Sequence, residues 1–94
     1  MSYKVSLSDK AEDDFARLDK SVQKQIFKYL KKLEEREDPR SLGEQLQANL
    51  SSFWKYRVGD YRLVAEIQEG KLIVLVLVIA HRREVYKVAD KRLN

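Results

Sequence analysis

Three basic residues flank a tight-turn dipeptide in the second half of the chain. Lys55 and Arg57 precede Gly59-Asp60, and Arg62 follows it. This dipeptide is typical of a two-residue hairpin turn, because glycine supplies the positive φ that such turns require. The register of such a hairpin places Arg57 opposite Arg62 and puts all three basic side chains on one face of the sheet. Like charges opposite each other destabilise a sheet, so this face is predicted to bind an anion such as a phosphate.

A second basic cluster follows the last apolar run of the chain. It comprises His81, Arg82 and Arg83, with Tyr86 shortly after. Functional groups commonly lie at strand ends and in the loops that follow them. Histidine can serve as an acid or a base, and tyrosine can stack on a nucleobase. His81, Arg82 and Tyr86 are therefore further candidate site residues. The simpler alternatives are that the first cluster only extends into solvent, that His81 is a surface histidine and that Tyr86 packs on the sheet.

The composition excludes several other kinds of site. The 94 residues contain no cysteine and one histidine, which excludes thiolate ligation and a histidine-rich zinc site. The three glycines are far apart, so no glycine-rich phosphate loop is present. No metal and no cofactor is therefore expected. RNA cleavage fits these limits, because the substrate carries its own nucleophile, the 2′-OH. The protein then needs a base, cations for the phosphate and a donor for the leaving 5′-oxygen.

The distribution of charge also favours a polyanionic partner. Residues 1–47 hold ten basic and ten acidic side chains, whereas residues 48–94 hold nine basic and five acidic ones. The whole net charge of +4 therefore lies in the second half. A basic surface of this kind suggests a nucleic acid or an acidic protein as the partner.

The periodicity of apolar residues predicts the elements that position these side chains. Ser8 is a plausible N-cap for the first helix and Ser21 for the second. From Phe53 the apolar period changes from that of a helix to that of a strand. We expect strands over 3–7, 53–58, 61–67 and 72–80, helices over 9–18, from Ser21 to about 35 and over 88–93, a helical turn at 42–46, and hairpin turns at 59–60 and 69–70.

These elements predict one α+β domain over residues 1–94. An N-terminal strand and a helical hairpin precede an antiparallel β-meander, with the helices packed on one face of the sheet. The strand over 72–80 is apolar on both faces and is expected to be central. No apolar run approaches the ~20 residues of a membrane-spanning helix. No secretory signal is visible at the start, so no membrane association and a cytoplasmic location are expected.

Three ordered stretches carry a family resemblance. Together with the opening strand and the helical hairpin, this resemblance covers nearly the whole chain. They are Trp54-Lys55-Tyr56-Arg57, Gly59-Asp60-Tyr61-Arg62-Leu63-Val64 and His81-Arg82-Arg83-Glu84-Val85-Tyr86. The set resembles the RelE/ParE superfamily of bacterial type II toxins, and its RelE branch in particular. The resemblance implies a RelE-like, microbial-RNase-like fold and a ribosome-dependent, metal-independent mRNA endonuclease that cuts message in the ribosomal A site. It also implies a cognate RelB-like antitoxin and a toxin–antitoxin hetero-oligomer.

The resemblance also implies roles for four residues by position. Lys55 resembles the family's basic residue proposed as general base, and Arg62 matches the arginine that stabilises the phosphate. Arg82 matches the arginine near the leaving group. Tyr86 matches the tyrosine that orients or stacks the substrate.

Arg57 departs from the pattern, because the RelE branch often has a second lysine at this place. Arginine is a poor proton acceptor, so the role of base falls on Lys55 alone or shifts to His81. Two alternative functions stay open at this point. One is a ParE-like gyrase inhibitor on the same fold, and the other is a non-catalytic basic module that binds RNA or protein.

Overall fold

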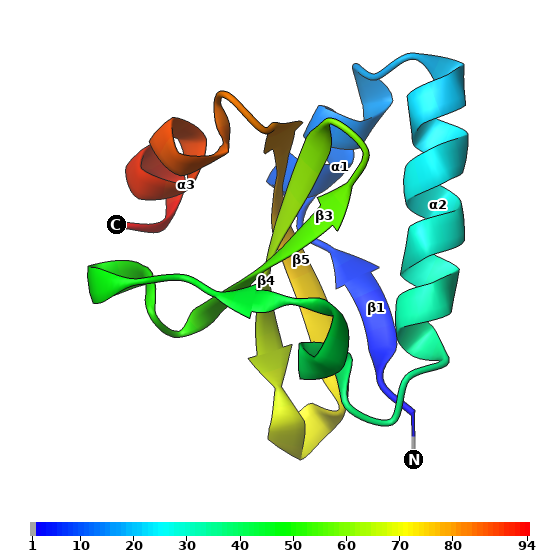
Figure 1. Cartoon of the computed structure of the whole chain (residues 1–94), viewed down its shortest axis with the longest axis vertical. Coiled ribbons are helices and arrows are strands. Elements are labelled where there is room, and N and C mark those ends of the chain that lie inside the picture. The colour runs from blue at the N-terminus through cyan, green and yellow to red at the C-terminus, as the bar shows by residue number, and fades with distance from the viewer. Residues whose placement is uncertain (1) are drawn as a thin grey trace.

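A five-stranded sheet in the order β1-β5-β4-β3-β2 organises the computed structural model, which describes residues 2–94 (Figure 1). β1 runs parallel to β5, and the other neighbouring strands are antiparallel. β5 lies between β1 and β4, which confirms the prediction of a central strand. The strands are β1 (Lys4–Leu7), β2 (Glu44–Gln45), β3 (Phe53–Val58), β4 (Tyr61–Gln68) and β5 (Ile73–His81).

Three α-helices accompany the sheet, with short 3-10 turns in the connections. The helices are α1 (Asp9–Ala16), α2 (Lys20–Glu34) and α3 (Val85–Leu93). Ser8 is the N-cap of α1, because its hydroxyl accepts a hydrogen bond from the N–H of Ala11 at 3.2 Å. Ser21 does not cap α2. The helix begins earlier because Asp19 is extended and its carbonyl accepts the N–H of Gln23 at 2.9 Å.

Two connections differ from the predicted ones. The expected helical turn at 42–46 is wrong, since Glu44 and Gln45 form β2 and pair with Lys55 and Trp54 of β3. The helical turns lie on either side of β2, at Pro39–Leu42 and Ala48–Leu50. The expected hairpin turn at 69–70 is a 3-10 turn over Glu69–Lys71, after which Leu72 adopts a positive φ of 55°.

The helical hairpin of α1 and α2 covers one face of the sheet. Ile26 and Leu33 of α2 are fully buried against Tyr56 and Leu63 of the sheet. Trp54, Val58 and Tyr61 pack in the same cluster, as their alternation along β3 and β4 predicts. We call this side of the sheet the hairpin face.

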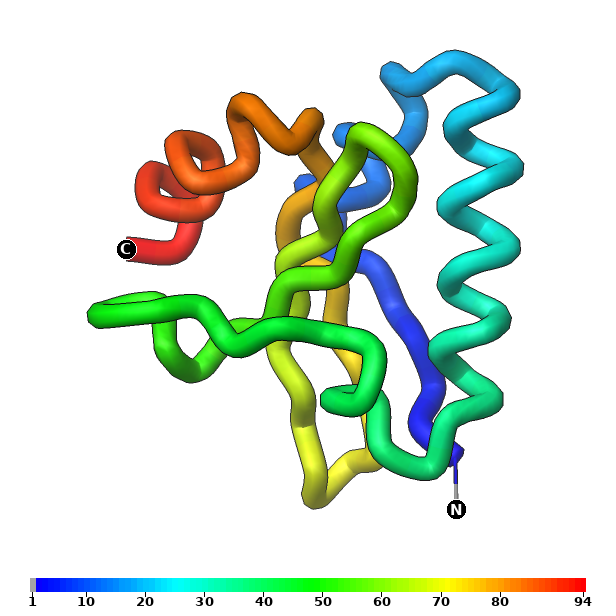
Figure 2. Tube along the Cα trace, in the orientation of Figure 1, coloured from blue at the N-terminus to red at the C-terminus, as the bar shows by residue number. Residues whose placement is uncertain are grey.

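The third helix packs against the opposite face, which the prediction of helices on one face did not include. α3 begins three residues earlier than expected and buries Val85 and Ala89 against Val64 and Val78. The segment between β2 and β3 extends beneath the end of α3 (Figure 2), where Asn49 donates a hydrogen bond of 2.5 Å to Asn94. None of the helices in the described residues is long and apolar enough to cross a membrane.

Candidate functional site

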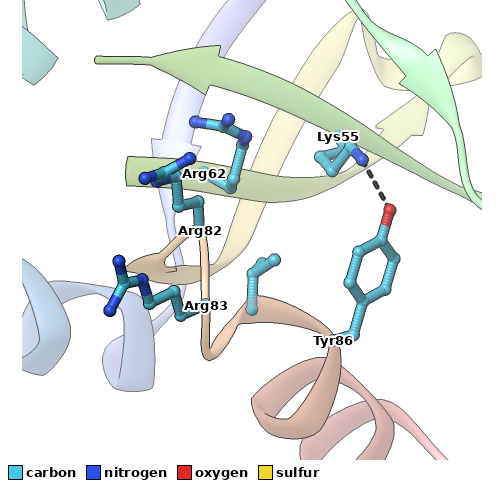
Figure 3. Close-up of a pocket in the computed structure, with 6 residues that line it drawn as sticks. Lys55, Arg62, Arg82, Arg83 and Tyr86 are labelled. Atoms are coloured by element: carbon cyan, nitrogen blue, oxygen red, sulfur yellow. Dashed lines mark hydrogen bonds between the residues drawn. The ribbon is translucent and has the colours of Figure 1, made fainter. Parts of the chain in front are cut away.

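A pocket of about 510 Å³ lies on the face of the sheet opposite the helical hairpin. It is lined by residues of β3, β4, the loop after β5 and the first turn of α3 (Figure 3). We call it the basic pocket, because four of its side chains are cationic and none of the lining side chains described is a carboxylate. The lining residues are Lys55, Arg62, Arg82, Arg83, Val85 and Tyr86.

The hairpin between β3 and β4 sets the direction of two of these side chains. Arg57 pairs with Arg62 and Lys55 with Val64, which confirms the predicted register. Val64 is fully buried beneath α3, so Lys55 points to the same side as this helix. Gly59 makes the tight turn possible with a φ of 58°. A side chain there would also come within 2.9 Å of Gln25.

Hydrogen bonds to backbone carbonyls at the turn between β3 and β4 anchor Arg62 and Arg82. Nη1 of Arg62 donates hydrogen bonds of 2.9 Å to the carbonyls of Gly59 and Tyr61. The N–H of Arg82 donates to the carbonyl of Asp60 at 2.8 Å, which ties the loop after β5 to the turn. Nε of Arg82 lies 3.8 Å from the Asp60 carboxylate, and both side chains are more than half exposed. Such an exposed pair is weak, so Arg82 can exchange it for a bound anion.

Lys55 and Tyr86 meet across the pocket from two elements far apart in the sequence. Nζ of Lys55 lies 2.5 Å from Oη of Tyr86 and 4.8 Å from the centroid of its ring (Figure 3). A lysine ammonium only donates hydrogen bonds, so the phenol oxygen accepts here and its O–H points elsewhere. The Tyr86 side chain is 56% exposed, which leaves its ring accessible for stacking on a base.

The positive charge of the pocket is largely uncompensated. Within the described part of the chain, Lys55, Arg62 and Arg83 form no ion pair with a carboxylate within 4.0 Å. Lys55 and Arg62 are also half-buried, so solvent screens their charges less than it would screen those of fully exposed side chains. The pocket is therefore arranged to attract and hold an anion. Residues 2–94 contain no group of three or more side chains that could ligate a metal.

Arg83 is a lining residue that sequence reasoning did not select. It belongs to the basic cluster after β5, and its side chain lies on the same side of the pocket as that of Arg82 (Figure 3). Its N–H donates to Nδ1 of His81 at 3.2 Å, which shapes the loop. A loop has no side-chain periodicity, so only the charge of Arg83 could have indicated its place in the pocket.

Two predicted site residues lie outside the basic pocket. His81 pairs with Tyr61 and packs edge-on against its ring, with the ring centroids 5.6 Å apart, on the hairpin face. Arg57 is exposed and lines a separate shallow hollow with Lys28 and Lys32 of α2. The structure thus brings together Lys55, Arg62, Arg82 and Tyr86 of the six predicted residues, and adds Arg83.

The fold of the chain is similar to that of solved structures over most or all of its length. The chain is similar to the RelBE2 toxin–antitoxin complex of Mycobacterium tuberculosis, with a TM-score of 0.80, 24% identity, and coverage of 87% of this chain and 100% of that chain. It is also similar to a mutant Escherichia coli toxin RelE in the free state, with a TM-score of 0.75, 24% identity and full coverage of both chains. These similarities support a RelE-like fold.

Comparison of sequences gives the family. The chain is 29% identical over 97 residues to a RelE-like toxin protein of Escherichia coli, and both chains are covered completely. Residues 5–86 match the family model of the ParE toxin of the type II toxin–antitoxin system parDE. With its basic pocket on a RelE-like sheet, the chain therefore belongs to the ParE toxin family of type II toxin–antitoxin systems, within the RelE/ParE superfamily.

Proposed function

We propose that this toxin is a metal-independent endoribonuclease that cuts mRNA in the ribosomal A site and so stops translation. The observation that carries the proposal is the basic pocket, where the Lys55–Tyr86 pair faces three arginines without a lining carboxylate. These groups match a reaction in which the RNA supplies the nucleophile and the protein supplies a base and positive charge.

In the proposed reaction, Lys55 acts as the general base and takes the proton of the substrate 2′-OH on its Nζ. The 2′-oxygen then bonds to the adjacent phosphorus, and the bond from phosphorus to the 5′-oxygen breaks. Arg62 stabilises the charge that develops on the phosphate oxygens. Arg82 donates a hydrogen bond to the leaving 5′-oxygen, which takes its proton from solvent because arginine does not release one. The products are a 2′,3′-cyclic phosphate and a free 5′-OH.

The position of His81 supports Lys55 as the base. His81 lies against Tyr61 on the hairpin face, whereas Lys55 lines the basic pocket. Tyr86 orients the amine of Lys55 through their 2.5 Å contact, and its exposed ring stacks on a base of the substrate. Arg57 lies outside the pocket, and we assign it to a flanking phosphate.

We also propose that the toxin is held inactive by a RelB-like antitoxin in a hetero-oligomer in the cytoplasm. Solved relatives of this fold include RelB–RelE complexes from Mycobacterium tuberculosis, Pyrococcus horikoshii and Escherichia coli. The positive charge of the second half of this chain suits an acidic partner segment.

Induction of the toxin without and with the product of its neighbouring gene tests both proposals. Primer extension should map new message 5′ ends within minutes of induction, and co-expression of the antitoxin should abolish them. Arg82→Ala should lose the cuts while it still co-purifies with the antitoxin. Arg36→Ala, which removes an exposed arginine far from the pocket, should cut as the wild type does. Equal cutting by wild type and Arg82→Ala would contradict the proposed site.

A ParE-like inhibition of DNA gyrase is the second candidate, and the match to the ParE family model favours it. In that case the basic pocket would hold an acidic protein surface rather than a phosphodiester. Cells would then accumulate damaged DNA while their message stays intact, and purified toxin would inhibit supercoiling by gyrase. Binding to RNA or ribosomes with neither effect would instead indicate a non-catalytic module.

A further inference from the structure

We propose that the ion pair between Asp14 and Arg92 is a positioning device for the basic pocket. It holds α3 at the orientation in which Tyr86 meets Lys55. The consequence for catalysis rests on the proposed nuclease function, whereas the structural consequence does not. Neither Asp14 nor Arg92 lines the basic pocket, so their effect on it would pass through α3.

The ion pair joins three elements through four hydrogen bonds. Arg92 of α3 donates to both carboxylate oxygens of Asp14 in α1, at 2.8 and 3.2 Å. Nη1 of Arg92 also donates to the carbonyl of Leu77 in β5 at 2.9 Å. The N–H of Ile79 in β5 donates to Asp14 at 3.0 Å. The forked geometry fixes the direction of the guanidinium as well as its distance.

The pair is also withdrawn from solvent, unlike the other ion pairs of the described chain. The side chains of Asp14 and Arg92 are 10% and 20% exposed, whereas every other ion pair has a carboxylate that is more than half exposed. Exposed pairs order their side chains weakly. A largely buried, bidentate pair holds one arrangement, because the loss of either partner leaves an uncompensated charge.

The helix depends on such an anchor because its apolar contacts are small. α3 has nine residues; its fully buried side chains are Val85 and Ala89, and Val88 and Leu93 pack against the same cluster while partly exposed. A helix of this length has little stability by itself. Val85 and Ala89 share a face with Arg92, which follows them by seven and three residues. The two small apolar residues fix one end of this face and the ion pair fixes the other.

The position of Tyr86 follows from the orientation of the helix face that carries Val85, Ala89 and Arg92. Tyr86 comes one residue after Val85, which places it about 100° around the helix and directs it over the basic pocket. A rotation of α3 about its axis would therefore move Tyr86 away from Lys55. Arg92 resists this rotation from a point about 9 Å further along the helix axis.

A structural test needs no RNA. In purified toxin with ¹³C-labelled tyrosine rings, a nuclear Overhauser effect should connect the Tyr86 ring to the Lys55 side chain. Asp14→Asn should weaken it several-fold, and Asp13→Asn, which changes an exposed neighbour, should not. If Asp14→Asn does not fold by circular dichroism, Arg92→Lys is compared with Lys91→Arg, since lysine keeps the charge and loses the fork. An unchanged effect in a folded variant would overturn the proposal.

A kinetic test separates positioning from general stability. Asp14→Asn should lower kcat for cleavage of ribosome-bound message by about 10–100-fold, with KM within about twofold, as expected for a misplaced reacting group. In a Tyr86→Ala background the same change should cost less than about twofold, because the effect passes through Tyr86. If the loss of kcat in the double variant equalled the product of the losses in the two single variants, the proposal would be overturned. A wild-type toxin that cuts no message would refute the proposed function, and the Overhauser measurement would still decide the role of the ion pair.

Discussion

The two faces of the sheet are built from the same strands and have opposite characters. On the hairpin face, α1 and α2 close over fully buried side chains such as Tyr56 and Leu63. On the other face, α3 covers Val64 and Val78 and leaves Lys55 and Arg62 half-buried beside an open pocket. Because side chains alternate along a strand, β3 and β4 supply a closed core and a charged site at the same time.

The comparison shows how the chain tolerates an unfavourable site. Arg57 and Arg62 stand opposite each other, an arrangement that destabilises a sheet by a few tenths of a kcal/mol. Lys55 adds a third positive charge on the same strands. The apolar contacts of the hairpin face offset this cost, so stability and anion binding reside on different sides of the same sheet.

The largest effect on stability is expected from a shortened side chain on the hairpin face. Leu63→Ala should lower the free energy of unfolding by about 2–5 kcal/mol, because Leu63 is fully buried and its removal leaves a cavity. Urea denaturation followed by circular dichroism measures this change. A loss below about 1 kcal/mol would mean that the hairpin face does not carry the stability of the fold.

Arg62→Ala, on the face that carries the basic pocket, should reduce activity strongly and leave stability nearly unchanged. Cleavage of message should fall by about 10²–10³-fold, as when one preorganised donor is removed from a developing negative charge. The free energy of unfolding should change by no more than about 1 kcal/mol, since the lost hydrogen bonds are exposed or half-buried. Single-turnover cleavage and urea denaturation give the two numbers, with Arg36→Ala as the matched control. A variant that cuts normally would exclude Arg62 from the site.

The free energy of unfolding is expected to depend on pH because of two tyrosines on the hairpin face. Burial raises the pKa of Tyr56 well above its usual 10.0, and burial also raises that of Tyr29. The unfolded chain therefore loses these protons first as the pH rises past about 10. Stability is complete below that pH and falls above it, by at most about 1.4 kcal/mol per pH unit for each tyrosine.

Tyr56→Phe should flatten this alkaline decline, although it also removes the hydrogen bond of 2.9 Å from Tyr56 to the carbonyl of Pro39. Tyr86→Phe, which changes an exposed tyrosine of the basic pocket, should leave the slope as it is. Urea midpoints between pH 8 and 11 measure both. An equal decline in the wild type and in Tyr56→Phe would rule out Tyr56 as the source.

The smallest effect is expected from one arginine at the rim of the basic pocket. Arg83→Gln should reduce the slope of log affinity for single-stranded RNA against log salt concentration by about 0.7, the loss of one phosphate contact. The weakening should be similar for RNAs of different sequence. Fluorescence anisotropy at several salt concentrations measures the slope, and Arg36→Gln serves as the control. An unchanged slope would show that Arg83 does not contact the RNA.

The parts of the fold that obey a local rule were predicted correctly. Gly59-Asp60 and the alternation around it fixed the register that pairs Arg57 with Arg62. Ser8 was identified as a helix cap from its type and its place before an acidic first turn. The pairing of Glu44 and Gln45 with β3 was missed, because a two-residue strand exists only through its partner. The positive φ of Leu72 was missed as well, since the turn was expected at residues 69–70.

For the candidate site, the sequence by itself determined which charges the strands carry and which face they share. A strand fixes the direction of each side chain through its period of two, so Lys55 and Arg62 followed from spacing. The tertiary structure alone decided that Tyr86 meets Lys55, that Arg83 joins the basic pocket and that His81 faces the hairpin side. Arg83 and Tyr86 belong to a loop and a short helix, whose orientation depends on contacts with distant parts of the chain such as Asp14. His81 ends β5, one residue beyond the predicted strand, where it pairs with Tyr61.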